Sequence, residues 1–279
     1  MQFFLILHRN QKPHPVNDLK VVTIQTALEW ENPEVNLRNF DRIIRAIRSD
    51  PDLILLPEMF NTGFSVNPEK VGEAMDGPSV AFLKQWADLT GAMVMGSLLI
   101  KTGGSVFNRL VAAGPKGTLY YYDKRHLFRL SEEFRLISQG RERRVIRFRG
   151  WNILLQVCYD LRFPVWSKNR YDADGYEYDL MVYVANWPAT RSDVWHTLLK
   201  ARAIENQSYV AGVNRIGVDG FGAQHTGESM VLDPRGKTIT LSAMNEEVVS
   251  SVVLNRNDLQ VFRDSFTVGM DWDTFTINP

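Results

Sequence analysis

Apolar residues along the chain occur in two kinds of pattern, one typical of buried strands and the other of helices that cover them. Apolar stretches at residues 53–56 and 180–185, and at 153–157 with Gln156 as its one polar residue, are typical of strands buried on both faces of a sheet. Elsewhere apolar side chains recur at intervals of three and four residues, the spacing of one buried helix face. The first such face comprises Leu37, Phe40, Ile43, Ile44 and Ile47. The alternation of the two patterns predicts an α/β fold.

Residues that start or stop secondary structure divide this pattern into elements. Asn32 and Pro33 suit the first turn of a helix, and Gly91 suits the end of a second one. Ser192 or Asp193 is the expected cap of a third helix, which runs to about residue 206. We expect a further helix near residues 256–262, surface loops at 123–140 and 171–178, and strands at 20–26, 52–57, 92–100, 106–113, 118–122, 144–149, 153–157, 180–185, 209–214, 227–232, 237–241 and 248–254.

The two ends of this pattern define the expected domain. Residues 1–17 begin with a short apolar run and continue as a polar segment that contains proline. They lack the basic start, longer apolar region and cleavage site of a signal peptide, so we expect an extension outside the fold. No fixed-period repeat, low-complexity tract or linker interrupts the remainder. Residues 18–279 are therefore expected to form a single domain.

Composition narrows the classes of function. The 279 residues are 44% hydrophobic and 23% charged, which is ordinary for a globular protein with a large core. Lysine and arginine total 32 and so do aspartate and glutamate, so no excess charge favours nucleic acid or a membrane surface. No apolar run approaches the roughly 18 residues of a membrane span. The single cysteine allows no internal disulfide, which is typical of a reducing cytoplasm.

Three residues with complementary chemistry follow the ends of predicted strands. Glu58 comes after the apolar run 53–56, Lys124 after the strand 118–122, and Cys158 after the strand 153–157. Ligands of covered α/β sheets bind outside strand ends, so these side chains could converge. A thiol with a pKa near ~8.5 needs a base or a nearby cation to act as a nucleophile at neutral pH. Each residue alone also has a structural explanation, as a turn residue, a solvated lysine or a small core side chain.

The sequence around these residues resembles the catalytic motifs of the nitrilase superfamily of carbon–nitrogen hydrolases. The three motifs are Leu-Leu-Pro-Glu58-Met-Phe, Tyr-Asp-Lys124-Arg-His-Leu-Phe and Cys158-Tyr-Asp-Leu-Arg-Phe-Pro, in the order of the family and over roughly residues 19–266. The resemblance implies a four-layer α-β-β-α sandwich that forms homodimers or higher homo-oligomers. It also implies hydrolysis of a small-molecule amide without a metal or other cofactor.

The resemblance also assigns roles to individual residues. Cys158 is the expected nucleophile, Glu58 the general base and acid, and Lys124 the oxyanion stabiliser, with the backbone N–H of Tyr159 as a second donor. Family members often carry another glutamate after the lysine motif. Alignment with similar sequences favours Glu133 over the adjacent Glu132 for this position.

Further segments resemble the omega-amidase branch, whose members cleave the terminal amide of 2-oxo acids such as 2-oxoglutaramate and 2-oxosuccinamate. These segments are residues 162–167, 183–188 and 201–206. Many superfamily members carry a glutamate at the position of Val165, so pocket details of distant relatives transfer poorly. A substrate of this class requires a cation, for which Arg162 is the candidate, and Trp187 and Phe64 are candidate pocket walls. An ion pair of Arg162 with Asp160 or another acid is the structural alternative.

Other functions remain open at this point. A carbamoylase, an aliphatic amidase or a nitrilase would carry the same three motifs. A cysteine–histidine hydrolase would need His126 or His196 as the partner of the thiol, and neither belongs to a known motif of that class. The five histidines form no cluster with acids that is typical of a metal site.

Overall fold

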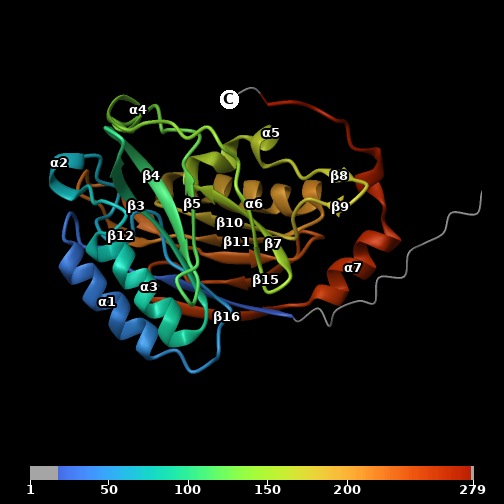
Figure 1. Ribbon diagram of the computed structural model, residues 1–279, viewed down its shortest axis with the longest axis horizontal. Coiled ribbons are helices and arrows are strands. Elements are labelled where there is room, and N and C mark those ends of the chain that lie inside the picture. Colours follow the sequence, from blue (N-terminus) through green and yellow to red (C-terminus); the bar gives the residue numbers. More distant parts are fainter. Residues whose placement is uncertain (1–17, 278–279) are drawn as a thin grey trace, which may run out of the picture.

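Two six-stranded sheets form the centre of the computed structural model, which describes residues 18–277 (Figure 1). The expected extension at residues 1–17 lies outside the described residues. The first sheet has the strand order β16-β1-β2-β3-β4-β5. Its strands are β1 (Leu19–Gln25), β2 (Leu53–Leu55), β3 (Met93–Thr102), β4 (Ser105–Ala113), β5 (Leu119–Asp123) and β16 (Val248–Leu254).

The second sheet has the strand order β15-β14-β11-β10-β7-β6. Its strands are β6 (Val145–Phe148), β7 (Trp151–Val157), β10 (Leu180–Val184), β11 (Tyr209–Val213), β14 (Met230–Leu232) and β15 (Thr238–Leu241). In each sheet three neighbouring central strands are parallel, namely β1-β2-β3 and β7-β10-β11. Parallel strands leave their carboxyl ends at one edge, and the predicted reactive residues follow two of these ends.

Alternate side chains of the central strands enter different cores. In β1, Val21 points into the core between the sheets, whereas Val22 points toward the outer helices. In β2, Leu53 belongs to the inner core and Ile54 to the outer one. Because successive side chains of a strand point to opposite faces, a strand covered on both sides must be apolar throughout. This explains the continuous apolar runs of the sequence.

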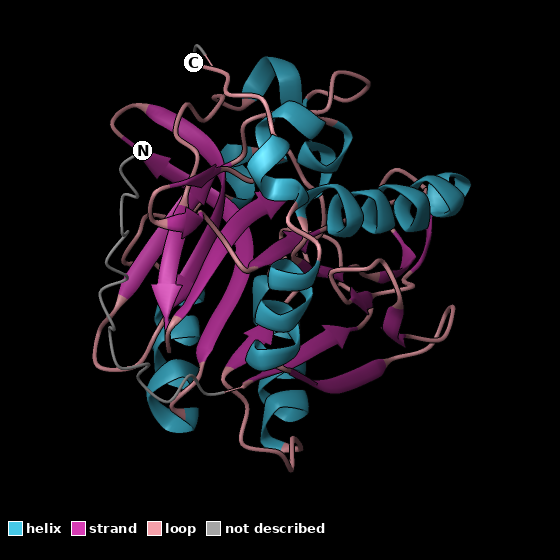
Figure 2. Cartoon of the chain, turned by 90° about the vertical axis from the view of Figure 1, so that its right-hand side faces the viewer, coloured by secondary structure: helices cyan, strands magenta, loops and turns pink. Residues whose placement is uncertain are grey.

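Helices cover the outer faces of both sheets (Figure 1, Figure 2). On the first sheet, α1 and α3 bury Phe40, Ile43, Leu83 and Trp86 against the strands. On the second sheet, α6 packs against β11 and β14. The result is the predicted α-β-β-α sandwich. The helices are α1 (Pro33–Arg45), α2 (Pro68–Val71), α3 (Pro78–Thr90), α4 (Glu133–Leu136), α5 (Pro164–Ser167), α6 (Ser192–Asn206) and α7 (Arg256–Ser265).

Helix ends agree with the sequence at two positions and differ at a third. The side chain of Asn32 caps α1 by accepting the N–H of Val35 at 3.3 Å. Gly91 ends α3 with a left-handed φ of 69°. The expected cap of α6 by Ser192 or Asp193 is wrong, because the helix starts at Ser192 itself and follows the short 3-10 turn η2 (Ala189–Arg191) without a side-chain cap.

Several short elements interrupt the predicted loops. The segment 123–140 contains α4, and the segment 171–178 forms a two-stranded hairpin of β8 (Tyr171–Asp172) and β9 (Gly175–Tyr176). The first half of the strand expected at 227–232 is not extended, since β14 begins at Met230. A second hairpin pairs β12 (Ile216–Val218) with β13 (Gln224–Thr226), and 3-10 turns form η1 (Cys158–Arg162) and η3 (Val268–Asp271).

Candidate active site

The three predicted reactive residues converge in the structure, as their positions after strands required. Glu58 follows β2, Lys124 follows β5, and Cys158 is the first residue of η1 after β7. Each side chain is almost fully removed from solvent, with exposed fractions of 0%, 1% and 9% respectively. The first two come from one sheet and the third from the other, so the site lies between the two sheets.

The ammonium group of Lys124 is enclosed by two carboxylates. It donates to Oε1 of Glu58 at 2.9 Å and to both oxygens of Glu133 at 3.0 Å. The neighbouring Glu132 instead lies at the surface and pairs with Arg135. The structure therefore brings Glu133, and not Glu132, into contact with the lysine.

Asn108 is a member of this cluster that sequence reasoning missed. It lies in β4, is fully buried, and its Nδ2 donates to Oε1 of Glu58 at 2.8 Å and to Oε1 of Glu133 at 3.0 Å. The same residue accepts the backbone N–H of Lys124 at 2.9 Å. Asn108 thus adds a second donor between two carboxylates that would otherwise repel each other. Its signal in the sequence is a lone amide inside an otherwise apolar strand.

Asn186, the second missed residue, connects the base to the thiol. Its backbone N–H donates to Oε2 of Glu58 at 2.8 Å, and its side-chain amide donates to the carbonyl of Glu58 at 2.5 Å. The thiol of Cys158 donates to the carbonyl of Asn186 at 3.8 Å. Asn186 therefore contacts both the carboxylate of Glu58 and the sulfur of Cys158.

The charges in the cluster determine its protonation. Burial disfavours the Lys124 ammonium, but the negative charges of Glu133 and Glu58 outweigh burial and raise the pKa of Lys124 above its ordinary value. Burial, followed by the charge of Glu58, raises the pKa of the Cys158 thiol, and Lys124 offsets only part of this rise. The resting cysteine is therefore a protonated thiol, which would need a base to accept its proton in order to act as a nucleophile.

The backbone presents the sulfur in a strained conformation. Cys158 has a φ of 42°, which side chains other than glycine rarely adopt. The carboxylate of Asp160 stabilises the turn by accepting the N–H of Val157 at 3.0 Å, the hydroxyl of Tyr122 at 2.8 Å and the N–H of His126 at 3.0 Å. One buried carboxylate thus joins the cysteine turn to the segment that follows β5.

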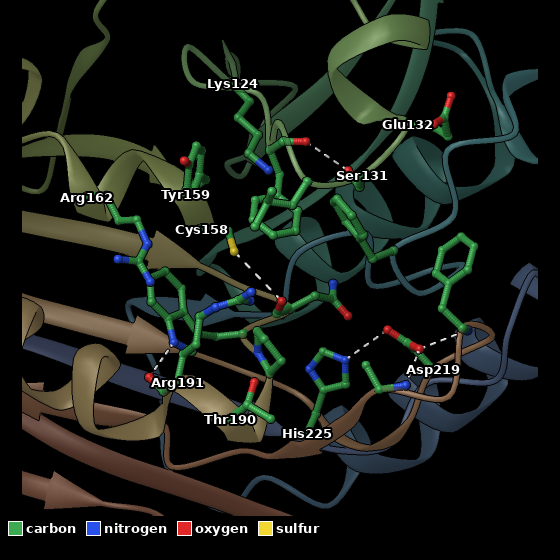
Figure 3. Close-up of a pocket in the computed structure, with 18 residues that line it drawn as sticks. Lys124, Ser131, Glu132, Cys158, Tyr159, Arg162, Thr190, Arg191, Asp219 and His225 are labelled. Atoms are coloured by element: carbon green, nitrogen blue, oxygen red, sulfur yellow. Dashed lines mark hydrogen bonds and ion pairs between the residues drawn. The ribbon is translucent and has the colours of Figure 1, made fainter.

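A pocket of about 540 Å³ opens onto the sulfur (Figure 3). Lys124 and Cys158 lie in its wall, together with predicted residues of the substrate site, which are Phe64, Tyr159, Arg162 and Trp187. The remaining wall combines apolar residues, such as Phe128 and Phe221, with polar and charged ones, such as Glu132, Arg191 and Asp219. All four substrate-site residues predicted from the sequence therefore face the pocket. Their individual roles stay predictions.

Arg162 does not form the ion pair that was its structural alternative. Its guanidinium lies 5.1 Å from the centre of the Trp187 ring. Asp160 is bonded instead to Nδ1 of His126 at 2.8 Å. Within residues 18–277 no carboxylate pairs with Arg162.

The histidines of the pocket differ from those considered in the sequence. His126 stacks on Phe163 at a centroid distance of 3.7 Å, and His196 lies 3.2 Å from Glu228. Neither lines the pocket, but the buried His225 of β13 does, and its Nε2 lies 3.2 Å from Asp219. The hairpin that carries both residues comes from a distant part of the chain, so nothing in the sequence indicated its place in the wall.

No group of three or more His, Cys, Asp and Glu side chains in residues 18–277 could hold a metal ion. No helix in the same part of the chain is both long and apolar enough to cross a bilayer.

Comparison with known proteins agrees with this geometry. The family model described as carbon-nitrogen hydrolase matches residues 20–264. The chain belongs to the carbon–nitrogen hydrolase family. Within that family it is 42% identical to the omega-amidase YafV of Yersinia enterocolitica, over 94% of this chain and 100% of the relative. It is 29% identical to a 2-oxoglutaramate amidase of Bacillus subtilis, over 88% and 94% of the two chains.

Solved structures of carbon–nitrogen hydrolases share the fold. XC1258 from Xanthomonas campestris, a CN-hydrolase superfamily protein with an arsenic adduct in its active site, is 41% identical to this chain. It superposes with a TM-score of 0.91 over 94% of this chain and 100% of its own. Nit3 of Saccharomyces cerevisiae, at 23% identity and a TM-score of 0.77 over 89% of this chain and 94% of its own, shares the fold.

Proposed function

We propose that this carbon–nitrogen hydrolase is an omega-amidase that converts 2-oxo acid amides, such as 2-oxoglutaramate and 2-oxosuccinamate, to the dicarboxylate and ammonia. The observation that carries the chemistry is the buried Glu58–Lys124–Glu133 cluster beside the thiol of Cys158. The substrate class is supported by the 42% identity to omega-amidases along nearly the whole chain. Other amidases of the family would share the cluster, so the substrate class rests on the relatives.

The first half of the proposed reaction forms a thioester. The carboxylate of Glu58 accepts the thiol proton as the sulfur of Cys158 attacks the amide carbon. The Lys124 ammonium and the backbone N–H of Tyr159 stabilise the negative charge that develops on the carbonyl oxygen. When the carbon–nitrogen bond breaks, Glu58 returns the proton to the leaving nitrogen, and ammonia departs.

The second half regenerates the enzyme. Glu58 accepts a proton from a water molecule, and the oxygen of that water attacks the thioester carbon. The carbon–sulfur bond breaks, the sulfur takes the proton back, and the carboxylic acid leaves. Both halves need a proton acceptor that stays beside the sulfur. The bonds from Lys124, Asn108 and Asn186 to Glu58 keep its carboxylate in place.

The accessory residues have distinct proposed roles. Glu133 orients Lys124, since both oxygens of its carboxylate accept from the ammonium at 3.0 Å. Trp187 and Phe64 form walls beside the acyl chain, and Arg162 contributes positive charge for the acid end of the substrate. No metal or other cofactor takes part in these steps.

The proposal extends to assembly and location. We infer that the chain forms one domain over residues 18–279 and assembles as a homodimer or higher homo-oligomer, as the family resemblance implies. A cytoplasmic location accords with a single buried, reduced cysteine.

Ammonia release from three substrates tests the proposal. The substrates are 2-oxoglutaramate, glutamine and an N-carbamoyl amino acid, each with wild type and with Cys158→Ala. We expect turnover of the 2-oxo acid amide by wild type and none by the variant, whose fold is checked by circular dichroism. Preference for the carbamoyl substrate would refute the omega-amidase assignment. Ammonia release by purified Cys158→Ala would refute the nucleophile.

A further inference from the structure

Two arginines line the pocket without an acidic partner. Arg162 and Arg191 both contribute to its wall. Within residues 18–277 neither guanidinium forms an ion pair or a hydrogen bond. Most other arginines near buried groups are paired, as Arg109 is with Asp123 at 2.6 Å. An arginine that is partly removed from water and lacks an anion indicates that the anion is supplied by a ligand.

The two arginines differ in where they point. The side chain of Arg191 extends from η2 into the pocket in the direction of Cys158 (Figure 3). Its guanidinium lies 5.4 Å from the ring centre of Phe128, whose own N–H bonds Glu133 at 2.7 Å. The side chain of Arg191 therefore extends from η2 toward residues 124–133, the segment that contains Lys124 and Glu133. Arg162 runs along the edge of the pocket, and its guanidinium lies over Trp187.

The backbone of Arg191 is held in place before any ligand arrives. Its carbonyl accepts the indole N–H of Trp187 at 2.8 Å, and its own N–H donates to the carbonyl of Pro188 at 3.0 Å. The residue immediately precedes α6, which has fifteen residues and packs on the second sheet. A rigid attachment reduces the entropy lost when the guanidinium binds an anion, and the guanidinium fork matches the two oxygens of a carboxylate.

We propose that Arg191 is the residue that binds the carboxylate of the substrate and so determines selectivity for acid-bearing amides. This inference rests on the proposed function and refines it: Arg191 makes the direct ionic contact, while Arg162 adds positive charge at the edge of the pocket. A substrate held between Arg191 and the sulfur has its carboxylate at one end and its amide at the other. That arrangement fits the terminal amide of a carboxylic acid, the class to which 2-oxoglutaramate belongs.

Steady-state kinetics of Arg191→Met test the assignment with 2-oxoglutaramate as substrate. The lost contact is remote from the reacting carbon, so KM should increase much more than kcat decreases. A charge-assisted contact of this kind corresponds to a loss of roughly 100-fold in kcat/KM. The inhibition constant of the product 2-oxoglutarate should increase by a similar factor. Arg191→Lys keeps the charge without the fork and should recover part of the loss.

Arg129→Met is the matched control. Arg129 is exposed, and its guanidinium lies 4.2 Å from the Phe134 ring centre, so the variant removes the same charge from an arginine–phenylalanine contact outside the pocket. It should change kcat/KM by less than about threefold, because exposed charges are screened. Equal effects of the two variants would refute a direct contact. A large loss in Arg162→Met with none in Arg191→Met would assign the carboxylate to Arg162 instead.

The kinetic results distinguish an error in the Arg191 assignment from an error in the omega-amidase assignment. If wild type hydrolyses 2-oxoglutaramate and Arg191→Met does so equally well, only the Arg191 assignment is refuted. If wild type prefers an N-carbamoyl amino acid, the omega-amidase assignment fails, and the same variants measured on that carboxylate still decide the role of Arg191. If wild type hydrolyses only uncharged amides, both fail.

Discussion

Replacement of Lys124 by methionine tests the electrostatic account of the catalytic cluster most directly. In the wild type one ammonium contacts two carboxylates at 2.9 and 3.0 Å, and all three groups are buried. At an effective dielectric constant of ~20, each contact at ~3 Å represents roughly 5 kcal/mol of attraction before desolvation. Lys124→Met leaves Glu58 and Glu133 facing each other without the cation. We expect the free energy of unfolding to fall by about 3–5 kcal/mol at neutral pH, with complete loss of amidase activity.

The loss of stability should depend on pH in a defined direction. Without the ammonium, burial and the charge of Glu58 raise the pKa of Glu133 further above the unfolded value of ~4.3. The folded variant then holds a proton that the unfolded chain has released. Its stability is therefore greatest below that unfolded value and declines as pH increases through the raised pKa. Urea unfolding at pH 5 and pH 8 measures the difference.

A double variant isolates the cause. Glu133→Gln in the Lys124→Met background removes one of the two unbalanced charges and should recover about 2 kcal/mol at pH 8 and less at pH 5. Arg109→Met is the matched control, because Arg109 pairs with only one carboxylate, that of Asp123, which is partly exposed. A Lys124→Met variant equally unstable at both pH values, and not improved by Glu133→Gln, would show that lost packing and not charge is responsible.

Three further variants test other parts of the site. Glu58→Gln removes the charge that, after burial, most raises the pKa of Cys158. We therefore expect faster alkylation of the thiol by iodoacetamide at pH 8 together with a loss of roughly 100-fold or more in kcat, and slower alkylation would contradict the direction of the shift. Asn108→Leu should lower the free energy of unfolding by about 1–3 kcal/mol and reduce kcat, because two buried carboxylates each lose a donor; unchanged denaturant midpoint and kcat would contradict this role. Gly140→Ala should cost about 2 kcal/mol in urea unfolding and reduce kcat, because its Cβ would lie 2.0 Å from the carbonyl oxygen of Asp123, next to Lys124; a variant as stable and active as wild type would show that this backbone can shift freely.

The sequence predicted the positions of those site residues that directly follow the end of a strand. Glu58 and Cys158 each follow a largely apolar run whose length and termination can be read directly from the residues, whereas Lys124 follows the tyrosine-rich and partly exposed strand β5. Such a run specifies a buried strand, and a strand end specifies where the next side chain emerges. The apolar runs predicted an α/β fold with covered sheets, whereas the four-layer arrangement was implied by the family resemblance. The family resemblance added the roles of these residues and the choice of Glu133.

Residues placed by tertiary contact could not be predicted in this way. Asn108 lies in the middle of β4, and only its contacts with Glu58 and Glu133 distinguish it from a structural amide. His225 reaches the pocket because the β12–β13 hairpin folds over it from another part of the chain. The pocket position of Arg191 was not predicted. It immediately precedes α6, and the sequence analysis considered only Ser192 and Asp193 there, as possible helix caps. Loop geometry decides these contacts, and no periodic pattern records it.

The charges of the site connect catalysis to substrate selection. The carboxyl groups of Glu58 and Glu133 share the ammonium of Lys124, while the thiol of Cys158 stays protonated. The attack on the amide adds negative charge beside these two acidic residues, which disfavours the acid end of the substrate at the same place. A substrate with a carboxylate therefore needs a cation at a distance from the sulfur that attracts its acid end and directs its amide to the cluster. Arg191 occupies such a position, which explains how an active site with two buried glutamates can favour a negatively charged amide.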